Sequence, residues 1–93
     1  MEEEMQKDAD SVLSEVTKKK SDARKQLTLI SALVKLRNIR DQVATQRGEK
    51  PSLEDRRAFN VTTEKLVKMW ENSMQTYSKE EQGLRLMLGT LWL

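Results

Sequence analysis

The chain has 93 residues, of which 34% are charged and only 4% are aromatic, and its formal net charge is +2. A chain this short forms at most one domain and cannot enclose a large core. It contains no cysteine and no histidine, which excludes disulfides, thiol nucleophiles, imidazole acid–base chemistry and the usual zinc sites.

The first predicted helix covers residues from about 3 to 47. Apolar residues recur in it three, four or seven positions apart, which is the spacing of one helix face. This stripe begins with Ala9, Val12, Val16, Ala23, Leu27, Ile30 and Val34. A second set then takes over the stripe, namely Leu29, Leu33, Leu36 and Val43. We interpret this change as a stutter in the apolar repeat. Between Val16 and Ala23 the stripe passes Lys19 and Lys20, whose stems can cover apolar surface.

Residues 48–52 form the predicted turn. Gly48 stands just past the expected helix end and Pro51 follows shortly after, which together predict that the helix stops here. Ser52 is the predicted N-cap of the next helix, with Asp55 three residues on in place of the more usual glutamate. Glu54 and Asp55 would lie in the first turn, where the helix dipole favours negative charge.

The second predicted helix covers residues from about 53 to 88. Its stripe alternates steps of three and four and consists of Val67, Trp70, Met74, Tyr77, Glu81, Leu84, Leu88 and Leu91. An apolar tail, residues 89–93, completes the stretch LRLMLGTLWL. The tail could dock on a partner protein, insert at a membrane surface, or pack on the N-terminal half of the first helix, and packing is favoured. A membrane-surface helix would need more basic residues than Arg85 alone, and neither predicted helix has the roughly 20 apolar residues of a membrane span.

A short linker between two helices joins antiparallel neighbours. The sequence therefore predicts an all-α fold, an antiparallel two-helix hairpin that resembles a coiled coil, in which each apolar stripe covers the other. The residues predicted to make the hairpin or partner contacts are Leu33, Leu36, Ile39, Trp70, Met74, Tyr77, Leu84 and Leu88.

Charge is distributed unevenly along the chain. Residues 17–50 contain ten Lys or Arg and three acidic residues, whereas residues 51–93 contain six of each. Clustered basic residues can bind an RNA phosphate backbone, and the alternative is a solvated helix face. The possible RNA contacts are Lys18, Lys19, Lys20, Arg24, Lys25, Arg37 and Arg40. Catalysis has little support, because no nucleophile, phosphate-loop or metal-ligand motif is present. We therefore predict a protein that is not an enzyme, with no catalytic, cofactor-binding or metal-binding residue.

Four blocks of the sequence resemble a known family. They are ADSVLSEV (9–16), KKKSDARK (18–25), ALVKLRNIRDQVATQRG (32–48) and YSKEEQGLRLML (77–88). Together they resemble the programmed cell death protein 7 family, a component of the small nuclear ribonucleoprotein of the minor spliceosome. The resemblance runs in order over roughly residues 9–88. The family protein is longer, and the departure after Leu88 implies a fragment or a shortened form.

The resemblance implies a nuclear scaffold protein that acts in mRNA splicing through protein–protein contacts. We expect it to use no cofactor. Its partners would be other ribonucleoprotein subunits, with small nuclear RNA as a possible further contact and no membrane. A link to apoptosis is implied by the family name only. Two alternatives stay open at this point. One is a basic helical module that binds the RNA backbone, and the other is an unrelated coiled coil that self-associates.

Overall fold

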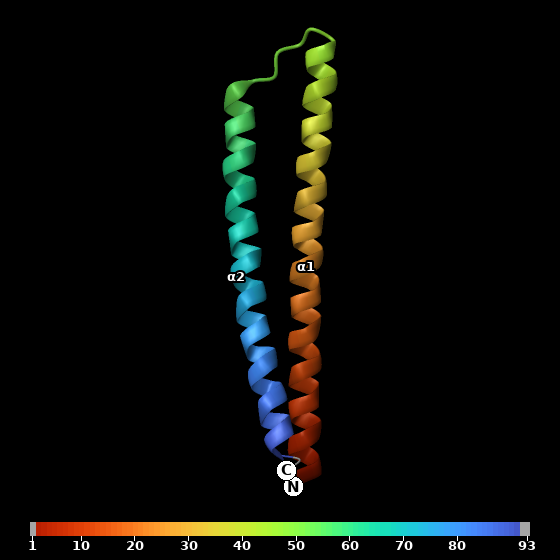
Figure 1. The fold of residues 1–93 in the computed structure, drawn as a ribbon, viewed down its shortest axis with the longest axis vertical. Helices are drawn as coiled ribbons and strands as arrows, with labels where there is room; N and C mark the ends of the chain where they lie inside the picture. Colours follow the sequence, from red (N-terminus) through yellow and green to blue (C-terminus); the bar gives the residue numbers. More distant parts are fainter. Residues whose placement is uncertain (1, 92–93) are drawn as a thin grey trace.

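The computed structural model describes residues 2–91, which form two long α-helices joined by a short loop. Helix α1 covers Glu2–Gln46 and helix α2 covers Leu53–Leu91. The helices run antiparallel and side by side, so that the start of α1 and the end of α2 lie at the same end (Figure 1). The molecule measures 70 × 17 × 16 Å, and a 45-residue helix at 1.5 Å per residue is itself about 68 Å long. The predicted all-α antiparallel hairpin is confirmed.

Helix α2 continues beyond the predicted end at residue 88 and includes Gly89 and Thr90 of the predicted tail. Trp92 and Leu93, the last two residues of that tail, lie outside the described residues. In the part of the chain that the structure describes, neither helix is long and apolar enough to cross a membrane.

The loop between the helices is built around Gly48, whose φ of 82° lies in the left-handed region that favours glycine. The N–H of Glu49 donates to the carbonyl of Ala44 at 2.9 Å, and the N–H of Gly48 donates to that of Thr45 at 3.0 Å. These two bonds form a Schellman motif, which pairs carbonyls that the end of α1 would leave free. Gly48 therefore ends the helix because it accepts a backbone conformation that other residues adopt at a cost.

Ser52 caps the N-terminus of α2. Its hydroxyl oxygen accepts a hydrogen bond from the N–H of Asp55 at 3.4 Å, and its carbonyl accepts one from the N–H of Arg56 at 3.1 Å. The first of these is long, so the cap is weak. Glu54 and Asp55 lie in the first turn. The positive end of the helix dipole stabilises their negative charges there.

The face of α1 that turns toward α2 follows one uninterrupted heptad pattern. Its buried or half-buried residues are Gln6, Ala9, Leu13, Val16, Lys20, Ala23, Leu27, Ile30, Val34, Arg37, Asp41 and Ala44. Every other side chain described on α1 is exposed. The predicted stutter is therefore wrong, because the row keeps its alternating steps of three and four and does not shift to Leu29, Leu33, Leu36 and Val43. Toward the loop the row passes instead through Arg37 and Asp41 to Ala44, and the sequence-based stripe included none of these three.

The matching face of α2 alternates in the same way. Its half-buried residues include Thr63, Val67, Trp70, Met74, Tyr77, Glu81, Leu84 and Leu88. We call the contact between this row and the inward row of α1 the seam. Among the side chains that the structure describes, those of residues 3–90, only Val16, Ala23 and Ile30 are buried, and Ala23 is 0% exposed. The core is thus a single line of side chains along the seam. Its buried members all come from α1, whereas the larger residues of α2, such as Trp70 and Tyr77, are half-buried.

Candidate functional site

A polar cluster interrupts the apolar seam at Glu81. The Nζ atom of Lys20 lies 3.7 Å from Glu81 Oε1, and the hydroxyl of Thr17 donates to Glu81 Oε2 at 3.4 Å. Arg85, one turn along α2, places its Nε 3.5 Å from Glu81 Oε1. The side chains of Lys20 and Glu81 are only 25% and 16% exposed. A pair of opposite charges in a coiled-coil seam favours one register, because any slip would leave each charge against apolar surface.

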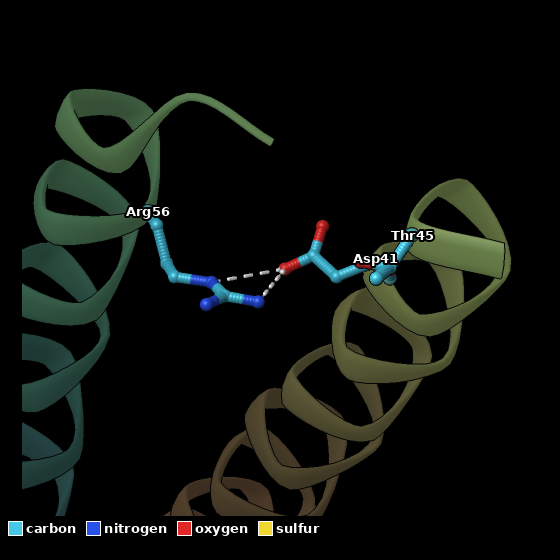
Figure 2. A network of polar contacts seen from close by, with 3 residues as sticks. All are labelled: Asp41, Thr45 and Arg56. Carbon is cyan, nitrogen blue, oxygen red and sulfur yellow. Dashed lines mark hydrogen bonds and ion pairs between the residues drawn. The ribbon is translucent and has the colours of Figure 1, made fainter. Parts of the chain in front are cut away.

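A second set of polar contacts joins the helices near the loop. The guanidinium of Arg56 donates from Nε and Nη2 to Asp41 Oδ2 at 3.4 and 3.3 Å (Figure 2). Asp41 also accepts, at its backbone carbonyl, the hydroxyl of Thr45 at 2.8 Å. One helical turn before Asp41, the guanidinium carbon of Arg37 lies 4.8 Å from the ring centre of Phe59, which is a cation–π contact. Charged side chains therefore take part in the loop end of the seam, next to the half-buried Ala44.

A hollow of about 330 Å³ lies beside this loop end. It is lined by Arg37, Arg40, Asp41, Ala44, Glu49, Lys50, Pro51, Ser52 and Asp55. Its lining carries three basic and three acidic side chains, so their formal charges cancel. Within residues 2–91, no group of three or more acidic side chains is placed to hold a metal ion.

The predicted contact residues divide into two groups. Five of them lie half-buried on the face of α2 that turns toward α1, namely Trp70, Met74, Tyr77, Leu84 and Leu88. The other three lie outside the inward row of α1 and are exposed, since Leu33 is 50% exposed, Leu36 63% and Ile39 56%. As contacts between the two helices these three were predicted incorrectly. As contacts to a partner they stay a prediction.

The physical reason for the error lies in Arg37 and Asp41. Sequence reasoning treated charged residues as outward-facing and followed the apolar ones, so it moved the stripe to the neighbouring row. In the structure both charged residues stay on the seam, because Phe59 and Arg56 of α2 provide partners for them. The steps of three and four that continue through Lys20, Arg37 and Asp41 were the signal in the sequence that could have identified the correct row.

The predicted RNA contacts do not form one continuous row. Lys18 and Lys25 are exposed, one heptad apart, on the outer side of α1, and Arg24 lies on a flank of the seam. Lys19 pairs with Glu15 at 3.5 Å, whereas Lys20 and Arg37 are engaged in the seam contacts described above. Arg40 lies exposed near the loop. Direct contact with RNA stays a prediction.

Several large exposed apolar side chains lie on the loop half of the hairpin. On α1 they include Leu29, Leu33, Leu36 and Val43, and on α2 they include Leu66 and Met69. The half-buried ring of Phe59, which contacts Arg37 of α1, is also counted with them. We call these seven residues the loop-half apolar face. Contiguous apolar side chains on a protein surface mark interaction sites, so this face is the candidate functional site of the described chain.

Comparison with known proteins identifies relatives. The family model described as programmed cell death protein 7 matches residues 1–90. Two proteins of that name are similar to this chain, one from Mus musculus and one from Homo sapiens. Each is 36% identical, over 92% of this chain for the mouse protein and 94% for the human one. The chain spans 18% of the length of either relative. No solved structure matches it.

Proposed function

Because this chain belongs to the programmed cell death protein 7 family, we propose that it is a non-catalytic scaffold subunit of the minor-spliceosome ribonucleoprotein. It would act in the nucleus, in pre-mRNA splicing, by helical contacts to other subunits of that particle. The chain covers 18% of its relatives' length, so the proposed role concerns only the segment of the family protein that the chain matches.

The observation that carries this proposal is the exposure of the loop-half apolar face on a rod whose own seam is already complete. The seam needs none of the six exposed side chains of this face, since the inward row of α1 continues past them without a shift. Phe59, the seventh residue, is half-buried and also contacts Arg37 of the seam. Exposing large apolar residues to water is unfavourable, and each contributes to binding only when another surface covers it. A rod 70 Å long can also hold two partners apart at a set distance, which is a mechanical property of scaffolds.

An affinity pull-down from nuclear extract tests the role. The chain is immobilised through its N-terminus, and the retained proteins are identified by mass spectrometry. We expect subunits of the minor spliceosome to be retained by the wild-type chain. The control is Ile30→Asp, which places a charge at a buried seam position and should unfold the hairpin. Retention of these subunits by neither chain, or equally by both, would contradict the proposed scaffold role.

A further inference from the structure

The loop-half apolar face repeats the geometry of a helix-packing seam. On α1 its row steps through Leu29, Leu33, Leu36, Arg40 and Val43. These steps alternate four and three residues, as they do in the seam that already joins the two helices. Such spacing keeps a row of side chains facing one straight partner helix over several turns. Residues 29–43 extend over about 21 Å at 1.5 Å per residue, which four turns of a partner helix would cover.

Both helices contribute to the same flank of the hairpin. In an antiparallel pair each flank of the seam is formed by the same heptad positions of the two helices, so Leu33 of α1 and Leu66 of α2 lie on one flank. On the opposite flank, a shallow groove is lined by Arg24, Leu27, Thr28, Ser31, Ala32, Lys35 and Met74. The apolar flank therefore offers a two-helix surface into which a third helix could pack.

The charged residues around the face are mainly basic. Four exposed basic residues lie on or beside it, namely Lys25, Arg40 and Arg47 of α1 and Lys65 of α2. Asp55 is the one acidic residue at the corresponding positions between 55 and 69. A second copy of this chain would bring the same patch, with the same basic border, against itself. Like charges brought together at an interface are unfavourable, so the border disfavours self-pairing and favours acidic residues on the partner.

From these observations we propose that the loop-half apolar face binds a third α-helix that carries a stripe of Leu, Ile, Val or Phe bordered by Asp and Glu. The complex would be a three-helix bundle in which the apolar stripe covers Leu33, Leu36 and Leu66. The acidic border would lie against Arg40 and Lys65. This inference rests on the proposed scaffold function and adds to it the surface and the chemical class of the partner.

A display library of designed helices tests the proposal. Each helix has about 25 residues, enough to span the face, with apolar stripe positions varied among Leu, Ile, Val, Phe and Met. The border positions are Glu in one third of the library, Gln in another and Lys in the last. The full chain is the bait. We expect the Glu-bordered helices to be enriched, and their binding to fall at least about tenfold for the double variant Leu33→Asp, Leu36→Asp.

Matched variants separate the face from the rest of the hairpin. Leu33 and Leu36 are exposed, so the double variant should keep its helical circular dichroism. Leu86→Asp is the control for an exposed leucine elsewhere on α2, and it should leave binding unchanged. The double charge reversal Arg40→Glu, Lys65→Glu should move the enrichment from Glu-bordered to Lys-bordered helices. Lys35→Glu, on the opposite flank, should not.

Three other outcomes would overturn the proposal, and a fourth would contradict only the scaffold role. Absence of enrichment, or equal enrichment of all three borders, would show that the face does not select an acidic helix. Binding to vesicles with anionic headgroups that the double variant abolishes would identify the face as a membrane-binding surface. A dimer in light scattering that the double variant abolishes would assign it to a second copy. Enrichment of acidic helices without minor-spliceosome proteins in the pull-down would support the face and contradict only the scaffold role.

Discussion

Truncation of Ile30 and Leu33 to alanine tests which row of α1 forms the seam. The two residues are three positions apart on the same helix, and both lose large aliphatic side chains. Ile30 is 9% exposed and Leu33 is 50% exposed. Only the packing against α2 distinguishes them, so the pair measures the register of the hairpin directly.

The expected magnitudes follow from burial. Each substitution removes three carbon groups, and each buried group contributes about 0.8 kcal/mol to the free energy of unfolding. For Ile30 this gives roughly 2.4 kcal/mol, and the cavity left behind raises the loss to about 2–4 kcal/mol. For Leu33, half of which is already in water, the loss should be about 1 kcal/mol or less. Because alanine is the better helix former, both losses should fall at the lower end.

Urea unfolding followed by circular dichroism at 222 nm measures both losses. If Ile30→Ala unfolds the hairpin completely, Ile30→Val removes a single carbon group and should cost about 0.5–1.5 kcal/mol. A loss for Leu33→Ala equal to or greater than that for Ile30→Ala would refute the reasoning. It would show that the apolar row through Leu33 faces α2 and that the seam contains a stutter after all.

The remaining predictions concern the loop and the polar cluster. Gly48→Ala should destabilise the hairpin by about 1 kcal/mol because φ there is 82°. Gly83→Ala should instead stabilise the hairpin by up to roughly 1 kcal/mol, because Gly83 is helical and an added Cβ would meet no other atom. The midpoint of thermal unfolding should therefore fall for Gly48→Ala and rise for Gly83→Ala. Shifts of the same sign would argue against the left-handed conformation at Gly48. Replacing both Lys20 and Glu81 with leucine should raise the midpoint of thermal unfolding and increase self-association in light scattering, because the pair that favours one register is lost. A lower midpoint with an unchanged monomer would contradict that role.

The sequence predicted the fold well because its local signals agree with one another. The glycine and proline of the loop, the serine cap and the steps of three and four in the second helix each depend on neighbours within one or two turns. Nearby residues in the sequence determine both the backbone conformation at Gly48 and the capping of α2 by Ser52. The seam of α2, from Val67 to Leu88, was predicted for the same reason, since Glu81 is the one charged residue in it.

The candidate site was harder to predict because it depends on which of two neighbouring rows turns inward. Both rows of α1 have helical spacing over residues 29–44, and the outer one is the more apolar. Hydrophobicity alone therefore placed Leu33, Leu36 and Ile39 in the hairpin. The structure exposes all three, and two of them, Leu33 and Leu36, belong to the loop-half apolar face.

The sequence by itself determined two helices, the place where the first ends and the second begins, and the repeat that lets them pair. These features arise from backbone geometry and from spacing along one helix. Only the tertiary structure decided the register near the loop, because Arg56 and Phe59 come from the other helix to meet Asp41 and Arg37. A charged residue can stay in a seam when such a partner is opposite it, and no property of a single helix reveals that the partner is there.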